Sequence, residues 1–489
     1  MTRLDELYRP SLALATDLYQ LTMAQAYRTS GSSDKEAVFH LFFRRNPFGG
    51  GFAVACGLAR VIDYLSGFRF SGEDLAYLAS VSGNDGQPLF EPGFLDELGA
   101  LNLRCDVDAV PEGTVVFPQE PLVRVRGPIL QAQILETALL NIVNFETLIA
   151  TKAARVCLAA GGDTVIDFGL RRAQGFDGGL SASRAAHVGG CAATSNVLAG
   201  RLLGIPVRGT HAHSWVMSFD SEEEAFDAWG RAQPNNCVLL VDTYDSLEGV
   251  RRAVETGRRL RERGHRLAGI RLDSGDLAYL SIEARRILDE AGFADTAIVA
   301  SNDLDEHVIA SLKQQGAAIT VWGVGTRLVT GGDQPALGGV YKLAAVRRPG
   351  GRWEHRVKVS EQAIKTTTPG IQQVRRFETE AGFLADVIYD EEQGQGAEVV
   401  LVDPVDPTRH KRIPEDAVGE DLLVPVARAG RIVHPPAPLA ASRERTRRQL
   451  DRLHAGIKRF VHPHQYPVGL SPRLHELKTR LVLETRGFS

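Results

Sequence analysis

Five short apolar runs, each ending in Asp, Asn or Gly, constrain the fold of this chain more than any other feature. They are 164–169 (TVIDFG), 238–242 (VLLVD), 269–273 (GIRLD), 297–302 (AIVASN) and 319–325 (ITVWGVG). Continuous apolar runs of this length are typical of strands buried on both faces, as in a parallel sheet. Stretches of helical composition alternate with them, at 185–203, 246–264, 277–291 and 305–315. The alternation predicts repeated βα units.

Repeated βα units build either a (β/α) barrel or a doubly wound sheet, and both place function at the C-terminal ends of strands. No G-x-G-x-x-G follows the first strand of any unit, which disfavours a dinucleotide-binding sheet. We therefore expect an α/β protein with an irregular (β/α) barrel at 131–345. Partly alternating strands predict an open α/β sheet domain at 1–130. Short strands mixed with Gly and Pro predict an α+β extension at 346–489 that packs on the other two.

The composition is that of an ordinary globular protein. Of the 489 residues, 44% are hydrophobic and 24% charged, and the formal net charge is −4. This balance allows a sizeable buried core and gives no reason to expect a polyanionic partner or a membrane surface. We expect neither nucleic acid nor a membrane as partner.

The cysteines and the N-terminus indicate a cytoplasmic protein. Five widely spaced cysteines are too far apart for zinc-type pairs and odd in number for a disulfide framework. The start, MTRLDELYRP, has charges throughout and no apolar signal core. The most apolar segment, 129–150, carries Glu136 and Glu146, so we expect a buried helix rather than a membrane span.

A helix rich in arginine is predicted at 442–460. Glu444 and Asp451 interrupt its positive charge, which favours a solvated helix face over an arm that binds nucleic acid.

The segment 167–175 (DFGLRRAQG) places Arg171 and Arg172 directly after a buried strand. Arginine presents fixed, permanently charged donors that suit carboxylate or phosphate ligands. The structural alternative is that these arginines pair with an acid such as Asp167.

The segment 209–219 (GTHAHSWVMSF) holds His211 and His213 beside Thr210. It supplies no third ligand, so it does not predict a metal site. A single histidine is more often structural than catalytic, and both roles stay open for His211 and His213 at this point.

In 269–277 (GIRLDSGDL), Arg271 and Asp273 lie two apart and project to the same side of a strand. Together they suit a phosphate and its Mg²⁺ counter-ion, and Asp242 supplies a further carboxylate. A plain salt bridge between Arg271 and Asp273 is the alternative.

The glycine-rich strand exit at 321–339 includes Gly323, Gly325 and Thr326. Backbone N–H groups of glycine-rich segments after the late strands of a barrel commonly bind a phosphate. Many glycine-rich segments, however, are ordinary loops without a ligand. Taken together, the four segments predict a large anionic ligand at the strand ends. A phosphorylated sugar that carries a pyrophosphate fits this description.

At these residues the chain closely resembles the nicotinate phosphoribosyltransferase family. The resemblance covers the four segments above and the segments 15–27 (ATDLYQLTMAQAY), 39–52 (FHLFFRRNPFGGGF) and 462–471 (HPHQYPVGLS). It implies the type II phosphoribosyltransferase kind of barrel. It also implies a homodimer whose active sites form between the sheet domain of one chain and the barrel of the other.

The family joins nicotinate to 5-phosphoribosyl 1-pyrophosphate, giving nicotinate mononucleotide and pyrophosphate for NAD salvage, with ATP hydrolysis coupled through a phosphorylated histidine. That histidine falls in a Thr-x-Ala-His segment, which implies His213, while His211 takes the variable place. Catalytic roles follow for Arg171, Arg271 and Asp273, with Mg²⁺ held near Asp242 and Asp273. The implied substrate-binding residues are Tyr19, Thr210, Arg172, Ser195, Gly323, Gly325, Thr326 and Thr367.

Ser195 stands where similar enzymes that use nicotinamide carry an aspartate. A carboxylate there would repel nicotinate, so its absence favours the acid over the amide.

Other functions stay open at this stage. A nicotinamide or quinolinate phosphoribosyltransferase would share the architecture. A barrel lyase would need a Schiff-base lysine, and none of the strand-end runs contains one. A non-enzymatic interaction protein would use the basic C-terminal helix.

Overall fold

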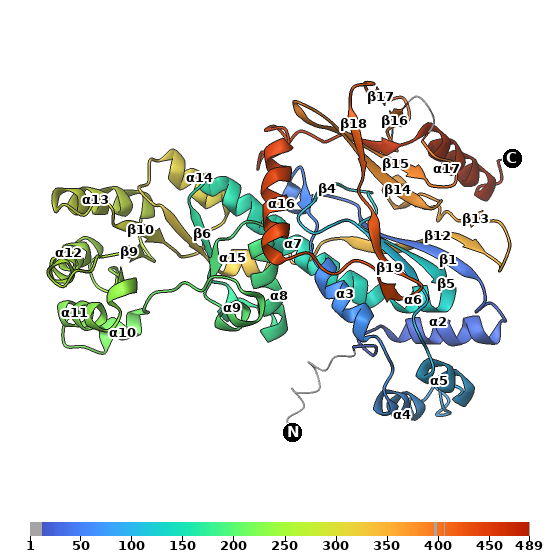
Figure 1. The fold of residues 1–489 in the computed structure, drawn as a ribbon, viewed down its shortest axis with the longest axis horizontal. Coiled ribbons are helices and arrows are strands. Elements are labelled where there is room, and N and C mark those ends of the chain that lie inside the picture. The colour runs from blue at the N-terminus through green and yellow to red at the C-terminus, as the bar shows by residue number, and fades with distance from the viewer. Residues whose placement is uncertain (1–11, 396–398, 405, 489) are drawn as a thin grey trace. The chain divides into compact units, whose positions relative to one another are not determined.

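The computed structural model describes residues 12–395, 399–404 and 406–488. They pack into two compact units (Figure 1). We call Leu148–Pro335 the barrel unit, and Met1–Thr147 with Ala336–Ser489 the sheet unit. The expected divisions after residues 130 and 345 fall inside α6 (Ile129–Ile134) and β12 (Gly339–Arg347). The three-domain division therefore stays a prediction, and the compact units divide the chain elsewhere.

The barrel unit is built on one parallel sheet, and the structure describes all of its residues. The strands are β6 (Thr164–Asp167), β7 (Ala193–Thr194), β8 (Val238–Leu240), β9 (Gly269–Leu272), β10 (Ala297–Ala300) and β11 (Val321–Val324). Their spatial order is β7-β6-β11-β10-β9-β8, and every neighbouring pair is parallel. This is the sequence order around a circle, with β7 and β8 left as the two edges. The prediction of an irregular barrel is confirmed: the barrel is open along one seam.

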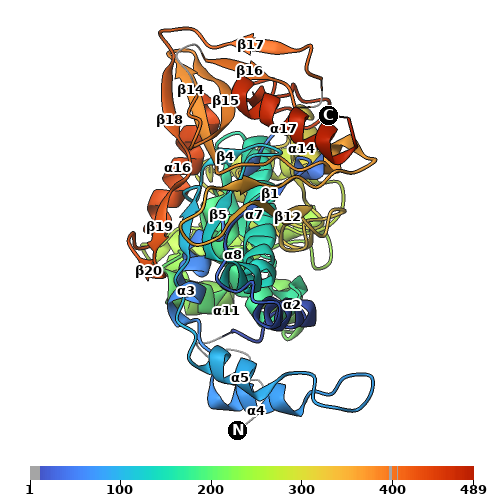
Figure 2. The same cartoon turned by 90° about the vertical axis from the view of Figure 1, so that its right-hand side faces the viewer.

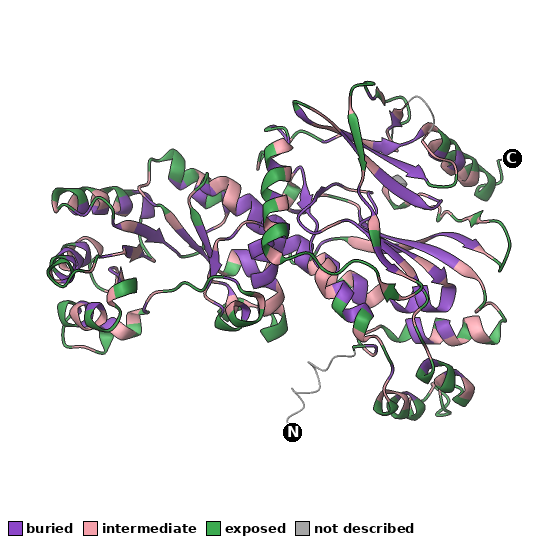
Figure 3. Ribbon diagram, in the orientation of Figure 1, coloured by how far each residue is buried: buried purple, intermediate pink, exposed green. Residues whose placement is uncertain are grey.

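Helices follow the strands of this sheet. They are α8 (Gly175–Val188), α9 (Val197–Leu203), α10 (His213–Met217), α11 (Glu222–Ala232), α12 (Ser246–Glu262), α13 (Leu277–Glu290), α14 (Glu306–Gln314) and α15 (Thr326–Val329), with short 3₁₀ turns at Leu170–Arg172 and Pro234–Asn236. Asp245, Asp276 and Asp305 cap α12, α13 and α14 by accepting hydrogen bonds from the first turn. Some of the acids that follow strand ends therefore start helices. The strands themselves are largely buried (Figure 3).

The predicted helix at 185–203 is wrong in its middle. The chain leaves α8 at Gly189 and Gly190, and Gly190 has a φ of 124°, which side chains rarely adopt. The strand β7 follows, and Asn196 then caps α9 with its side chain. Two adjacent glycines thus end the helix. The short strand that follows them was not predicted, because the composition of the whole stretch is helical.

The segment 206–213 runs along the open seam of the barrel. On one side, Thr194 in β7 donates to the carbonyl of Pro206, and the amide of Arg208 donates to the carbonyl of Thr194, each at 3.0 Å. On the other side, the amide of Leu240 in β8 donates to Nε2 of His211 at 3.2 Å. Backbone bonds therefore hold the segment to β7, and an imidazole holds it to β8.

Among its described residues, the sheet unit contains two larger sheets and one short strand pair (Figures 1 and 2). The seven-stranded sheet has the order β13 (Glu354–His355), β12, β1 (Glu36–Phe43), β5 (Val123–Pro128), β3 (Asp106–Ala109), β19 (Val424–Arg428) and β20 (Arg431–Ile432). The six-stranded sheet has the order β17 (His410–Arg412), β16 (Val400–Val402), β21 (Val468–Leu470), β15 (Gly382–Asp390), β14 (Gln372–Thr379) and β18 (Val418–Asp421). The pair is β2 (Ala53–Val54) with β4 (Val115–Val116).

The helices of the sheet unit lie mainly in its N-terminal half. They are α2 (Leu18–Thr29), α3 (Leu58–Gly67), α4 (Gly72–Ser80), α5 (Pro92–Gly99), α6, α7 (Glu136–Ala160), α16 (Leu439–Arg452) and α17 (Pro472–Thr485), with 3₁₀ turns at Pro47–Gly49 and Ala363–Lys365. The boundary between the two units falls within α7.

One helical stretch in the described chain, Ile129–Ala160, is long and apolar enough to cross a membrane by length and composition alone. Inside the protein, however, 61% of its most apolar window is buried. The stretch packs as a core helix, as the sequence predicted.

A buried charge cluster joins several segments of the sheet unit. Arg376 in β14 donates to both carboxylate oxygens of Asp386 in β15, and the Tyr466 hydroxyl donates to Asp386 at 2.8 Å. Glu120 is fully buried nearby and accepts from the amide of Phe117 at 2.9 Å. Burial and the neighbouring Asp386 carboxylate raise the pKa of Glu120 well above its usual range. We infer that Glu120 is held in its neutral form while Asp386 balances Arg376.

We expect Glu120→Gln to flatten the dependence of stability on pH. The pKa of Glu120 is higher in the folded protein than in the unfolded chain. The protonated side chain therefore contributes its full stabilisation below the pKa of the unfolded state, and this stabilisation is lost as the pH rises through the pKa of the folded state. Glutamine stays neutral throughout. The thermal midpoint of the variant should stay within about 2 °C of wild type at pH 5 and exceed it increasingly toward pH 9. The exposed Glu380→Gln is the control, and parallel pH profiles for wild type and Glu120→Gln would contradict the assignment.

Candidate functional site

Arg271 and Asp273 lie together at the C-terminal end of β9, as the sequence predicted from their spacing. The guanidinium of Arg271 donates to Asp273 Oδ1 at 2.9 Å, to the Ser301 hydroxyl at 2.8 Å and to the Thr210 hydroxyl at 3.0 Å. It also lies over the ring of Phe168, 5.4 Å from the centroid. The expected salt bridge therefore exists, but it belongs to a larger network that joins β9, the end of β10 and the seam segment.

Asp242 follows β8 and lies beside Asp273. Its Oδ2 accepts from the amide of Asp273 at 2.9 Å and from the Ser274 hydroxyl at 2.6 Å. Its Oδ1 is buried and accepts no hydrogen bond from any described residue. A buried carboxylate oxygen with no donor is a ligand of the kind that Mg²⁺ prefers, and the amide contact keeps the backbone of a second aspartate, Asp273, beside it. Asp242 and Asp273 thus fit a magnesium ion.

His213 is the first residue of α10 and lies near the carboxylate of Asp273. Its Nδ1 is 3.2 Å from the Thr243 hydroxyl, and its Nε2 is 3.7 Å from Asp273 Oδ2. The side chain is 40% exposed, so a ligand can reach the ring. In the tautomer whose Nδ1–H donates to Thr243, Nε2 carries the lone pair, and an imidazole nitrogen with a lone pair is a nucleophile.

His211 has a different environment from His213. Its ring is buried, lies 5.0 Å from the ring of Trp229 and accepts the Leu240 amide described above. Burial, assisted by the nearby Arg271 charge, lowers the pKa of His211 to about 4. The ring is therefore neutral near pH 7 and serves as an acceptor that holds the seam segment.

Arg171 and Arg172 lie on the 3₁₀ turn after β6, and both are exposed. The suggested partner, Asp167, is buried and already accepts from the Gly169 amide and from the hydroxyls of Ser183 and Thr194, each at 2.8 Å. Neither arginine pairs with Asp167 among the described residues. Both guanidinium groups are therefore available to a ligand at this end of β6.

Ser195 follows β7, and its amide donates to the carbonyl of Asp167 at 2.9 Å. This bond ties the start of the α9 turn to the end of β6. The position predicted to distinguish nicotinate from nicotinamide thus lies next to the turn that carries Arg171 and Arg172.

Gly323 and Gly325 lie at the end of β11, and Thr326 begins α15. A Cβ added at Gly323 would lie 2.5 Å from the Phe168 ring, so this glycine makes room for an aromatic side chain. Gly323 therefore has a packing role that does not depend on a ligand. Phe168 in turn lies against Arg271, so the glycine helps to place the arginine.

Tyr19 and Thr367 belong to the sheet unit. Tyr19 is on α2 and half-exposed, and its partial burial together with Glu136 and Asp17 raises the pKa of its hydroxyl. Thr367 is buried, and its hydroxyl accepts from the amide of Lys358 at 2.8 Å. The barrel unit thus brings together most of the predicted residues, while these two form part of the sheet unit.

Sequence reasoning missed four residues that shape the barrel site: Phe168, Thr243, Ser274 and Ser301. Ser301 lies in the predicted run 297–302, and Thr243 directly follows Asp242, so their positions at strand ends were a usable signal. The contact between Phe168 and Arg271 had no local signal, because it joins β6 to β9 across the barrel.

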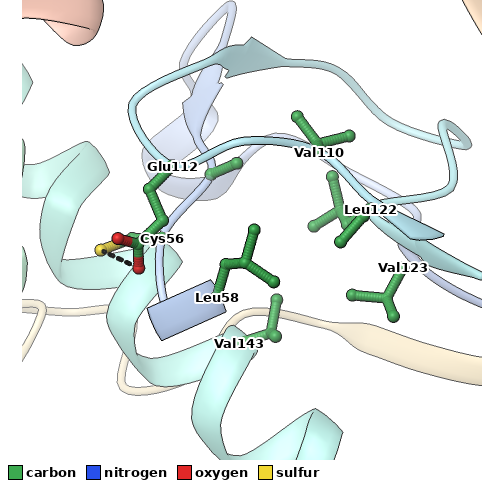
Figure 4. Close-up of a pocket in the computed structure, with 9 residues that line it drawn as sticks. Cys56, Leu58, Val110, Glu112, Leu122, Val123 and Val143 are labelled. Carbon is green, nitrogen blue, oxygen red and sulfur yellow. Dashed lines mark hydrogen bonds between the residues drawn. The ribbon is translucent and has the colours of Figure 1, made fainter. Parts of the chain in front are cut away.

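A second buried group of potential metal ligands, Cys56, Glu112 and Glu146, lies in the sheet unit. Glu112 accepts from the amides of Gly57 and Ala59 at the start of α3, which gives it a capping role. The adjoining cavity is about 10 Å³, no larger than one water, and mostly apolar side chains line it (Figure 4). We assign this group to structure.

The open parallel barrel, with arginine, paired carboxylates and a histidine at one end of its strands, defines a barrel enzyme with the type II phosphoribosyltransferase fold. The fold is shared with the nicotinate-nucleotide pyrophosphorylase of Pyrococcus furiosus, at 21% identity and a TM-score of 0.67, over 90% of this chain and 95% of that one.

Three family descriptions match successive parts of the chain. Residues 14–144 match the nicotinate phosphoribosyltransferase N-terminal domain, 164–351 the nicotinate phosphoribosyltransferase family and 371–478 its C-terminal domain. A nicotinate phosphoribosyltransferase of Bacillus subtilis is 42% identical, over 97% of each chain. The crystal structure of human nicotinic acid phosphoribosyltransferase has a TM-score of 0.83 at 35% identity, over 95% of this chain and 99% of that one. The chain belongs to the nicotinate phosphoribosyltransferase family.

Proposed function

We propose that this protein transfers the phosphoribosyl group of 5-phosphoribosyl 1-pyrophosphate to nicotinate, coupled to ATP hydrolysis through a phosphorylated His213. The product, nicotinate mononucleotide, would serve NAD salvage in the cytoplasm. One observation carries the proposal: Arg271, Asp273, Asp242 and Thr210 share a hydrogen-bond network beside an accessible His213. Family membership supports the choice of substrates.

The reaction forms a bond between the pyridine nitrogen and the anomeric carbon and breaks the bond from that carbon to pyrophosphate. Positive charge develops on the sugar and negative charge on the leaving group. The pyridine nitrogen already carries a lone pair, so no general base is required. The protein has to bind and neutralise pyrophosphate, which is the role we give to Arg171 and Arg271.

Asp242 and Asp273 are the residues that would hold Mg²⁺. When bound, the ion supplies positive charge that stabilises the departing group. The buried Oδ1 of Asp242, which has no described donor, supports this assignment.

In the coupling step, Nε2 of His213 attacks the γ-phosphorus of ATP, an N–P bond forms, and the bond to ADP breaks. The phosphoryl group would lie beside Asp273, whose carboxylate repels it. In the phosphorylated state the added negative charge would change the affinities of the site for its charged substrates, and attack of water on the phosphorus after transfer would break the N–P bond and release phosphate. Coupling of this kind needs different substrate affinities in the two enzyme states.

The remaining predicted residues would bind substrates. We assign the pyridine and its carboxylate to Tyr19, Thr210, Arg172 and Ser195, and the phosphate groups to the backbone at Gly323, Gly325 and Thr326 and to Thr367. Because Tyr19 and Thr367 belong to the sheet unit, we propose that a homodimer completes each site with residues of both chains.

The deciding experiment is product analysis with the purified protein, Mg²⁺ and 5-phosphoribosyl 1-pyrophosphate. Nicotinate, nicotinamide and quinolinate are supplied in turn, with and without ATP. We expect nicotinate mononucleotide to form, faster with ATP. Turnover of nicotinamide or quinolinate in place of nicotinate would reverse the assignment.

The interaction-protein alternative has weaker support. Arg447 on α16 pairs with Glu444 at 2.7 Å and Asp451 at 3.0 Å on the same helix, and Thr446 and Leu450 are buried. A solvated helix with internally paired charges explains these contacts.

We expect Ser195→Asp to reduce the preference for nicotinate over nicotinamide by roughly 10- to 100-fold in kcat/KM, because a carboxylate repels the acid and can accept from the amide. Ser195→Asn is the matched neutral control and should change the preference far less. Competition between the two pyridines measures it. Equal effects of Asp and Asn would exclude a role for charge at this position.

A further inference from the structure

Lys478 on α17 is a partly buried cation of the sheet unit. The helix packs against β15, β16 and β21 of the six-stranded sheet (Figure 1). Burial lowers the pKa of Lys478 to about 8. Among the described residues, its ammonium group makes no ion pair, and it donates to the hydroxyl of Thr368 at 3.3 Å. An unpaired ammonium group withdrawn from water lowers stability, so packing alone does not account for a lysine at this position.

The contact with Thr368 joins α17 to a segment that is neither helix nor strand. This segment, residues 366–371, lies between the 3₁₀ turn Ala363–Lys365 and β14. It contains Thr367, to which the proposed function assigns phosphate groups. The Thr367 amide donates to the carbonyl of Lys358 at 3.1 Å, and the Thr367 hydroxyl accepts from the Lys358 amide at 2.8 Å. Because Lys358 is also outside the helices and strands, these two bonds join one irregular segment to another.

Two strands hold the 366–371 segment at its C-terminal end. The amide of Gly370 donates to the carbonyl of Ala344 in β12 at 3.2 Å, and the amide of Ile371 donates to Oδ1 of Asp390 in β15 at 3.0 Å. Both bonds lie three or four residues after Thr367, so they restrain Thr367 only through the intervening backbone.

Lys478 holds the residue directly after Thr367. The Thr368 carbonyl also accepts from the Gln372 side chain at 2.6 Å, but Gln372 begins the strand into which the segment leads. Lys478 therefore supplies the hydrogen bond that reaches the neighbour of Thr367 from a separate helix.

We propose that Lys478 is a positioning residue for 5-phosphoribosyl 1-pyrophosphate, because its bond to the Thr368 hydroxyl fixes the backbone that carries Thr367. The hydroxyls of Thr367 and Thr368 have different partners, so Lys478 acts through the backbone and not by contact with the substrate. The inference rests on the proposed function for the role of Thr367.

The test removes the contact from either side in the full-length protein. Lys478→Met keeps the length of the side chain without its charge, and Thr368→Val keeps the shape without the hydroxyl. We expect each variant to weaken calorimetric binding of 5-phosphoribosyl 1-pyrophosphate with Mg²⁺ by roughly 3- to 10-fold, the value of one hydrogen bond. The KM for nicotinate should change less than about twofold. Because both substitutions break the same bond, the double variant should bind no more weakly than the weaker single variant.

Hydrogen exchange supplies a second measurement that needs no substrate. The amides of residues 366–371 should exchange faster in Lys478→Met and Thr368→Val than in the wild type. The thermal midpoint of Lys478→Met should stay within about 2 °C of wild type, because an apolar chain replaces an unpaired, withdrawn charge. Thr368→Ser keeps the hydroxyl and should behave as wild type. Arg480→Gln is the control for α17, since Arg480 is exposed and pairs with Glu484 on the same helix at 3.8 Å.

Unchanged affinity for 5-phosphoribosyl 1-pyrophosphate in the folded variants would overturn the inference, even with faster exchange, because the contact would then be only structural. Additive losses in the double variant would also overturn it, since Lys478 and Thr368 would act separately. If Lys478→Met fails to fold, Thr368→Val decides alone. The two proposals fail differently: a wild-type protein that binds 5-phosphoribosyl 1-pyrophosphate but makes no nicotinate mononucleotide contradicts the proposed function and leaves the role of Lys478 intact.

Discussion

Replacing Arg271 with alanine is expected to lower kcat/KM for phosphoribosyl transfer by about 10²- to 10³-fold, the usual effect of removing one positioned donor from a developing negative charge. Arg271 is held by Asp273, Ser301 and Thr210 and backed by the Phe168 ring, so its charge is fixed before substrate binds. Steady-state kinetics with varied 5-phosphoribosyl 1-pyrophosphate measures the effect.

Two further variants sharpen this test. Arg271→Lys keeps the charge but loses the fork that reaches three partners, so we expect an intermediate loss. Arg286→Ala, on α13, removes an exposed arginine whose partners Glu283 and Glu290 are on its own helix, and it should leave kcat/KM unchanged. If Arg271→Ala behaved like Arg286→Ala, the guanidinium of Arg271 would have no part in binding pyrophosphate.

Replacing His213 with alanine is expected to abolish stimulation by ATP, so that the rates of transfer with and without ATP become equal. Transfer without ATP should persist, because Arg271 and the two carboxylates remain. Incubation with γ-labelled ATP should give an acid-labile phosphoenzyme in the wild type and none in the variant.

His265→Ala is the matched control, because His265 precedes the N-terminal end of β9, whereas Thr243 and Asp273, which contact His213, follow the C-terminal ends of β8 and β9. It should retain both the phosphoenzyme and the stimulation. Undiminished stimulation in His213→Ala would remove the proposed phosphorylation site while leaving the transfer reaction unaffected.

Five of the six barrel strands, all except β7, could be predicted because each is a short, continuous apolar run that ends in polar residues or glycine. Such a polar residue often belongs to the site, as Asp242 and Asp273 do, since the ends of parallel strands meet at one edge. The gathering of strand ends at one edge is a property of any parallel sheet. The local pattern of a strand followed by an acid was therefore enough to predict that Asp242 and Asp273 lie together.

Long-range pairing could not be predicted in this way. β12 pairs with β1 and β19 pairs with β3, although most of the chain lies between the two strands of each pair, and no local pattern specifies such partners. The strand β7 was concealed because it is only two residues long and follows a helix. The contact of Phe168 with Arg271 likewise depends on how β6 and β9 face each other, which only the folded chain determines.

The gap between β7 and β8 gives the proposed phosphorylation site a mechanical property. A strand inside a continuous ladder cannot shift without breaking backbone hydrogen bonds along its whole length. The residues leading to His213 are instead held by two backbone hydrogen bonds to β7, by the imidazole of His211 at β8 and by the bond from Arg271 to Thr210. A shift of this segment would therefore break fewer backbone hydrogen bonds than a shift of a strand inside the sheet. The proposed phosphorylation of His213 would thus take place on a segment that is joined to the sheet at a few points and not along a continuous ladder.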